Sequence, residues 1–194
     1  MKKTLIAMLT SLFMFVCGEA SAQVYMGGMY GNSSSSYRGP EEDDVIEPKL
    51  KKGTGFRVYV GNEISRKFAA EISYVDLGDY EVGAASGGTL PATQVSDTIS
   101  IDGLDASFVA KLPLSRRVSM LGRLGLMYWQ GERLTIDSTS PDEDPKRFHD
   151  TDVSIGVGIE YQFLDRFGMT LEVDQYKTGW YYNLFYGVSL YVTM

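Results

Sequence analysis

The sequence predicts an all-β protein, an eight-stranded antiparallel up-and-down β-barrel that crosses a membrane. Apolar residues alternate with small or polar residues along most of the chain, which is the period of strands with one apolar face. Short polar turns alternate with long polar loops, as in an up-and-down barrel. The chain also begins with an export signal, and no later segment has the ~18 consecutive apolar residues of a membrane-spanning helix.

The N-terminal segment has the three parts of a secretory signal peptide. The chain starts Met-Lys-Lys, residues 5–16 are almost uninterruptedly apolar, and a small-residue Ala-Ser-Ala motif ends at Ala22. We expect cleavage between Ala22 and Gln23, which leaves residues 23–194 as the barrel domain. Because the one cysteine, Cys17, lies in the signal, we expect no disulfide, thiolate metal site or cysteine nucleophile in the mature chain.

The alternation indicates eight strands, four of them clear and four weaker. In the clearest segment, residues 153–163, large apolar residues occupy every second position, and Ser, Gly, Glu and Gln fill the others. The last segment, residues 184–194, repeats this pattern. The expected strands, in chain order, lie near 24–31, 56–64, 68–74, 98–112, 118–130, 153–163, 167–176 and 184–194.

Short and long connections between these strands alternate strictly. The short ones are residues 65–67, 115–117 and 164–166. In an up-and-down barrel all short turns lie at one end, and an even strand number places both termini at that end too. The longer polar connections, expected at the other end, lie near 32–52, 79–96 and 135–151, with a shorter one near 177–182.

The alternation alone leaves open which face points outward. A soluble barrel would bury the apolar phase, whereas a membrane barrel turns it toward lipid. The polar phase has few charges per strand, fewer than a water-facing surface normally carries. The large aromatics of the apolar phase gather near strand ends, as interfacial girdles do, so we expect a lipid-facing apolar phase, with the soluble barrel as the alternative. Those near the short turns are Phe68, Phe163 and Phe167, and those toward the long loops are Tyr74, Tyr128 and Tyr186.

Three stretches of the chain, residues 61–78, 108–129 and 150–176, resemble the transmembrane domain of OmpA-type outer-membrane proteins in order and in the position of the turns. The resemblance implies a barrel of the OmpA or opacity-protein type in the cell outer membrane, acting as a structural and surface-exposed interaction protein. The chain stops at the last strand, so we expect no peptidoglycan-binding domain.

The resemblance also implies a barrel interior plugged by acids and bases. By matching positions, Glu71 and Glu160 correspond to interior carboxylates, and Lys111 and Arg123 to interior cations. The family's remaining interior arginine, part of a described gate, would fall at Thr170. This departure argues against transferring the gating mechanism.

The same interior follows from physical chemistry, because a barrel of ~8 strands has a lumen that side chains can fill. Charges there need opposite partners or water. We expect Lys111 to lie between Glu71 and Glu160, with Arg123 as a second cation and Glu172 as a further acid. We expect this network to fill the lumen, and the alternative is a narrow channel for small solutes. All charges noted on the polar phase are Arg57, Glu63, Glu71, Lys111, Arg123, Glu160, Glu172 and Asp174.

Other functional classes have weak support. The net charge of −7 disfavours a nucleic-acid partner. The single histidine, His149, lies in an expected loop without a serine in strand phase beside it, so we expect no catalysis, although a lipid-modifying enzyme is a second alternative. The acidic runs 41–44 and 142–144 lack the spacing of a calcium loop. We therefore expect no metal site and no cofactor.

The last strand is similar to the C-terminal signal by which the barrel-assembly machinery recognises outer-membrane barrels, although Met194 stands where an aromatic residue is usual. The expected partners are this machinery, outer-membrane lipid and lipopolysaccharide, and a host or phage surface ligand of the long loops. We expect a monomer.

Overall fold

The structure, a computed structural model, describes residues 23–37, 53–82, 96–136, 146–179 and 181–194. The expected signal peptide lies outside the described residues, so cleavage between Ala22 and Gln23 stays a prediction. The described chain forms eight strands: β1 (Val24–Tyr37), β2 (Gly53–Ser65), β3 (Phe68–Val82), β4 (Ser96–Pro113), β5 (Val118–Ile136), β6 (Lys146–Gln162), β7 (Phe167–Thr178) and β8 (Tyr181–Thr193).

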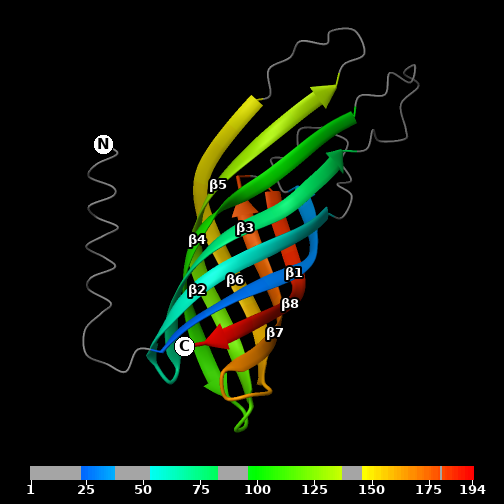
Figure 1. Cartoon of the computed structure of the whole chain (residues 1–194). Helices are drawn as coiled ribbons and strands as arrows, with labels where there is room; N and C mark the ends of the chain where they lie inside the picture. Colours follow the sequence, from blue (N-terminus) through cyan, green and yellow to red (C-terminus); the bar gives the residue numbers. More distant parts are fainter. Residues whose placement is uncertain (1–22, 38–52, 83–95, 137–145, 180) are drawn as a thin grey trace.

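These strands close into one antiparallel barrel (Figure 1). Each strand pairs with its neighbours in sequence, and β8 pairs with β1 from Tyr25↔Thr193 to Tyr37↔Tyr181. Closure gives each strand a backbone partner on both sides, which a chain in lipid requires. The predicted fold class and the eight strands are confirmed. In the part of the chain that the structure describes, no helix is long and apolar enough to cross a membrane.

The connections alternate in length, but strands extend into every expected long loop. Residues 32–37 of the expected loop 32–52 belong to β1, and residues 79–82 and 96 of the expected loop 79–96 belong to β3 and β4. The turns joining β2 to β3, β4 to β5 and β6 to β7 have two to four residues and lie at one end with both barrel termini. The fourth long connection is much shorter than expected, because β7 runs to Thr178 and β8 begins at Tyr181. Residues 135–136 and 146–151 of the expected loop belong to β5 and β6, so His149 lies in β6 and not in a loop. The polar ends of β5 and β6 still pair, from Arg133↔Lys146 to Gln130↔His149.

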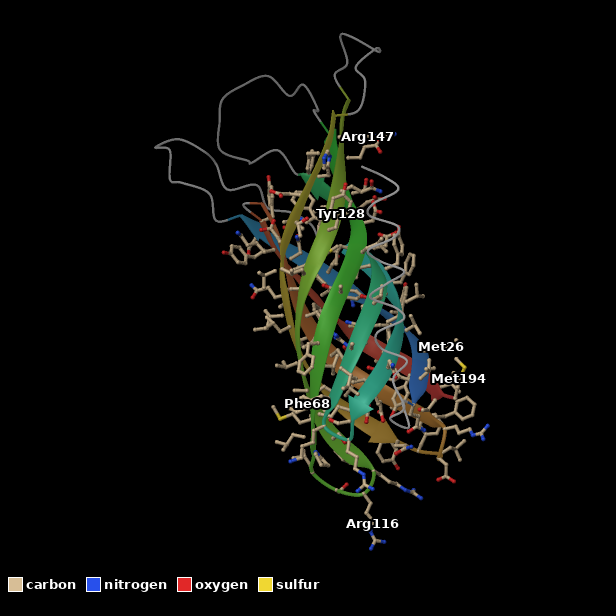
Figure 2. All side chains as sticks on the ribbon, turned by 90° about the vertical axis from the view of Figure 1, so that its left-hand side faces the viewer. Met26, Phe68, Arg116, Tyr128, Arg147 and Met194 are labelled. Carbon is tan, nitrogen blue, oxygen red and sulfur yellow. The ribbon has the colours of Figure 1, made fainter. Side chains whose placement is uncertain are left out.

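The outer face carries the apolar phase of the alternation. Along β2 the burial alternates residue by residue, with Val58 and Val60 exposed on the outside. Leu124 and Leu190 are 60% and 61% exposed, values that a soluble barrel would not show for its apolar core. Phe68 and Tyr128 lie toward opposite ends of this apolar band (Figure 2). The lipid-facing assignment is therefore confirmed, and the soluble barrel is excluded.

The inner face is layered. A lower apolar cluster lies toward the short-turn end, and an upper apolar cluster lies toward the long-loop end. On β3, β4 and β5 the charged or small inward residues come between a member of one cluster and a member of the other. The lower cluster is Tyr25, Tyr59, Ala69, Val109, Leu121 and Tyr191, and the upper cluster is Met29, Val75, Leu77, Tyr80, Ile101, Met127, Trp129, Tyr176 and Phe185.

Candidate functional site

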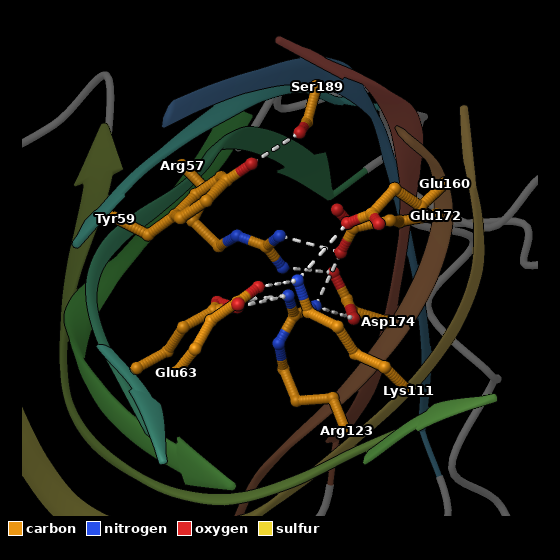
Figure 3. Close-up of polar contacts among 10 residues, drawn as sticks. Arg57, Tyr59, Glu63, Lys111, Arg123, Glu160, Glu172, Asp174 and Ser189 are labelled. Atoms are coloured by element: carbon orange, nitrogen blue, oxygen red, sulfur yellow. Dashed lines mark hydrogen bonds and ion pairs between the residues drawn. The ribbon is translucent and has the colours of Figure 1, made fainter. Parts of the chain in front are cut away.

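The middle of the lumen holds two arginines and three carboxylates, a set we call the central network: Arg57 of β2, Glu71 of β3, Arg123 of β5, and Glu172 and Asp174 of β7 (Figure 3). The period of two turns all five inward, because each has the parity of its strand's buried residues. Four strands of the barrel therefore supply charged side chains to one layer of the lumen.

Arg57 bridges the two acids of β7. Its Nη2 lies 2.6 Å from Glu172 Oε2, and its Nη1 donates to Asp174 Oδ2. The side chains of Arg57, Glu172 and Asp174 are only 1–2% exposed. A planar guanidinium can serve two carboxylates at once, which suits it to a site that water does not reach.

Arg123 joins the same acids to the opposite wall. Its Nη2 lies 2.9 Å and 3.1 Å from the two oxygens of Glu71, and its Nη1 lies 2.9 Å from Asp174 Oδ1 and also donates to Glu172. The network therefore runs continuously from β3 through Arg123 and β7 to Arg57 on β2. Separation or removal of any member would leave a buried charge without compensation, which is costly. The ion pairs therefore hold these strands in one register.

A second set of charges, the lower group, lies nearer the short turns. Lys111 Nζ lies 2.8 Å from Glu63 Oε1 and 3.4 Å from Glu160 Oε2, and 4.9 Å from the ring centre of Tyr25. The side chains of Lys111, Glu63 and Glu160 are 12–26% exposed, so this group is more accessible than the central network.

The structure brings all five expected interior charges into the lumen, but the expected pairing of Lys111 with Glu71 is wrong. The amide of Lys111 donates to the carbonyl of Lys67, which places Lys111 beside the β2–β3 turn. Glu71 lies four residues further along β3 and pairs in register with Ser107. Its partner is the longer Arg123, and Lys111 takes Glu63 instead.

Arg57, Glu63 and Asp174 are members of the site that sequence reasoning did not select, although all three lie in the polar phase. In the sequence, only their alternation with the apolar residues marks these three side chains as inward. This alternation does not say at what height in the barrel a side chain lies. Thr170, where the resemblance implies an arginine, is buried and pairs in register with Glu160. In this chain the second arginine of the network comes from β2.

Further polar contacts line the same layer. Ser154 donates to Asp105, and the hydroxyls of Tyr59 and Ser189 lie 2.7 Å apart. Small residues make room for large ones: a Cβ at Gly61 would meet the ring of Tyr25. A cavity of about 10 Å³ remains between the lower group and Arg123. A cavity needs at least ~10–15 Å³ of this kind to hold one water, so this cavity has room for a single water at most and is too small for solutes.

The upper cluster covers the central network on the long-loop side. Above it, Asp152 of β6 accepts hydrogen bonds from Trp129 Nε1 at 3.1 Å and from the amide of Gly179 at 2.8 Å, and it pairs with Lys177 at 3.2 Å. Gly179 has φ +62°, a left-handed conformation that favours glycine. These bonds fasten the short β7–β8 turn to the taller wall of β5 and β6.

Metal and nucleophilic chemistry have little basis in the described residues. These contain no group of three or more His, Cys, Asp or Glu side chains that could hold a metal ion. The acidic runs 41–44 and 142–144 lie outside them. His149 is exposed, with its ring centre 6.2 Å from that of Tyr128, and no serine in the described part of the chain donates to it.

The comparisons with known proteins agree with this architecture. The family model described as the outer membrane protein beta-barrel domain matches residues 5–190. No match was found among curated protein sequences.

Several solved structures share the fold. The attachment invasion locus protein Ail of Yersinia pestis, solved with the heparin analogue sucrose octasulfate, has 14% identity and a TM-score of 0.57, covering 90% of this chain and 100% of its own. Neisserial surface protein A has 12% identity and a TM-score of 0.57 at the same coverage. OprG of Pseudomonas aeruginosa has 12% identity and a TM-score of 0.58, covering 90% of this chain and 97% of its own. At these identities the likeness concerns the fold.

Proposed function

Because this chain belongs to the outer membrane protein β-barrel family, whose members lie in the outer membrane, we propose that it is a non-conducting barrel with a structural role and that its long loops bind partners at the cell surface. The observation that carries the proposal is the layering of the lumen. The central network is almost fully shielded from solvent, and apolar clusters lie above and below it.

Ions would have to cross both apolar layers and separate paired charges to pass through such a lumen. Desolvating an ion is costly, and hydrophobic constrictions close pores by excluding water. The ion pairs of the central network hold the side chains in place, so the resting barrel offers no continuous wet path through its described part. The side chains in the lumen then stabilise the barrel and fix the register of its strands, and the exposed loops bind partners.

Conductance in planar bilayers tests this proposal against the narrow channel. The full mature chain, folded and purified, is expected to give a silent bilayer. A channel would give discrete conductance steps that change on Lys111→Ala, whose side chain lies in the lumen, and stay unchanged on Arg116→Ala, whose side chain is exposed on a turn. Steps with that pattern would overturn the non-conducting role.

The charge of the long-loop end limits the kind of surface partner. The described residues there carry more exposed or half-buried acids than cations, and the intervening segments 38–52, 83–95 and 137–145 together carry nine acids and four cations. Such a surface repels polyanions, so a cationic ligand, or lipopolysaccharide bridged by divalent ions, fits it better. The described acids are Asp76, Asp79, Asp102, Glu132, Asp150 and Asp152, and the described cations are Arg147 and Lys177.

Ail has been solved with a heparin analogue, and the acidic loop end predicts that this chain differs in that respect. Intact cells that display the barrel are expected to retain no more fluorescent heparin than cells without it. Intact cells expose the long-loop end alone, so charge elsewhere on the barrel does not enter the measurement. Heparin retention that depends on the barrel would contradict the proposed partner class.

The remaining partners follow from the same role. We propose that the barrel is a monomer surrounded by outer-membrane lipid and lipopolysaccharide, assembled through its C-terminal strand by the barrel-assembly machinery, without a nucleic-acid partner. A lipid-modifying enzyme is disfavoured because a triad needs a base beside its nucleophile. Mass spectrometry of lipid A from cells with and without the chain checks this, since a change abolished by His149→Ala would support catalysis.

A further inference from the structure

Five cations lie on the three short turns, at the end of the barrel opposite the acidic loops. Arg66 and Lys67 follow β2, Arg116 and Arg117 follow β4, and Arg166 precedes β7. All five residues are exposed, and the label of Arg116 in Figure 2 marks this end of the molecule. The three turns contain one acid, Asp165, although the whole chain carries a net charge of −7.

These cations have no partners within the described protein. No carboxylate of the described residues lies within ion-pair distance of any of the five, whereas the inward cations Arg57, Lys111 and Arg123 are all paired. Two of the turns also share a fixed geometry. Ser65 accepts a hydrogen bond from the amide of Lys67, and Ser115 accepts one from the amide of Arg117, both at 3.3 Å.

Apolar side chains stand directly beside the cations. Leu114 and Leu164, at the tips of two turns, are each 59% exposed, and Phe68 and Phe167 begin the strands that follow Lys67 and Arg166. Aromatic and aliphatic residues at this position enter the boundary of the hydrocarbon layer. Long cationic side chains then extend their charged ends to the level of the lipid phosphates.

The turns connect three of the four pairs of neighbouring strands at this end, so the charges are spread around the barrel circumference. Short turns of outer-membrane barrels face the periplasm, where the adjoining leaflet consists of phospholipid. We propose that Arg66, Lys67, Arg116, Arg117 and Arg166 form a basic collar that binds the phosphate groups of anionic phospholipids in this leaflet. The collar would hold the barrel at a set depth and draw anionic lipid around it.

Spin-labelled lipids measure this selectivity directly. The mature chain is folded into phosphatidylcholine bilayers that contain trace spin-labelled phosphatidylglycerol or phosphatidylcholine, and the motionally restricted fraction gives the relative association of each lipid. One cation near a lipid surface predicts about a fivefold preference for phosphatidylglycerol at low salt. In 1 M salt, where charges are screened within ~3 Å, the preference is expected to fall below about twofold.

Three variants locate the effect. Replacing all five cations by glutamine is expected to abolish the preference, whereas R66K/R116K/R117K/R166K, which keeps the charge, and Arg147→Gln, at the opposite end, are expected to retain it. Heat-modifiable migration on gels verifies that each variant is folded. Equal association of the two lipids with the wild-type barrel, or a preference that survives the fivefold glutamine change, would overturn the proposal. Collar-dependent sedimentation with isolated peptidoglycan, without lipid preference, would overturn it in favour of a periplasmic polymer.

Discussion

Replacing Arg57 by methionine removes the guanidinium that bridges Glu172 and Asp174 in the middle of the lumen. The arginine side chain is 1% exposed, and its two partners are 2% and 1% exposed, so water does not take its place. Arg123 is then left with three carboxylates. Removing one member of a buried ion pair costs about 3–5 kcal/mol, because the remaining charge stays buried without compensation. That corresponds to roughly a 10²- to 10⁴-fold change in the unfolding equilibrium.

A second substitution separates lost charge compensation from lost packing. Methionine retains most of the volume of the arginine stem, so Arg57→Met leaves little cavity. Adding Asp174→Asn removes one of the uncompensated carboxylates. Because neutral groups can replace a buried ion pair at little net cost, the double variant is expected to regain about 2 kcal/mol relative to Arg57→Met alone.

Equilibrium unfolding in guanidinium, with the barrel refolded in micelles, measures these differences. The buried Trp129 reports loss of the barrel through its fluorescence. Val58→Met on the outer face of the same strand is the control and is expected to change the free energy of unfolding by less than about 0.5 kcal/mol. A loss below about 1 kcal/mol for Arg57→Met, or strictly additive effects in the double variant, would refute the coupled network.

Three other substitutions test other parts of the structure. Lys111→Met is expected to lower the free energy of unfolding in micelles by only about 1 kcal/mol, because water reaches the lower group; an unchanged thermal unfolding temperature would show that this group adds no stability. Gly78→Ala should lower the free energy of unfolding by about 1–2 kcal/mol, because Gly78 has φ +76° and an added Cβ would strike a backbone carbonyl of β2. Gly122→Ala, with open space around it, should leave the free energy of unfolding unchanged in the same chemical unfolding assay. Leu124→Arg on the outer face should cost about 2–4 kcal/mol in lipid vesicles, and Leu114→Arg at a turn tip should be tolerated; equal effects would contradict the assigned lipid boundary.

The strand positions could be predicted because lipid and lumen impose opposite demands on successive residues. Where both faces meet water the alternation fades, although backbone pairing continues. This explains why β5 and β6 extend beyond their predicted ends and why His149 was expected in a loop. The predicted limits of these strands followed the lipid boundary, whereas their actual limits follow the hydrogen bonds between strands.

For the interior charges, the sequence likewise predicted which side chains point inward but not which of them pair. Parity identified Glu71, Lys111, Arg123, Glu160 and Glu172 as inward residues, and the same rule applies to Arg57, Glu63 and Asp174. The partners depend on the stagger between strands, which a period of two does not contain. Lys111 lies beside the β2–β3 turn and therefore near Glu63. The register between β3 and β4 pairs Glu71 with Ser107, so Glu71 does not contact Lys111.

The sequence by itself determined the number of strands, the inward or outward direction of their side chains and the separation of short turns from long loops. It also predicts the export signal. All of these depend on local order along the chain. The tertiary structure alone decided the height of each inward side chain, and with it the two arginines that share three acids and the apolar layers around them. These depend on strand register and barrel closure, which bring together residues more than a hundred positions apart, such as Arg57 and Asp174.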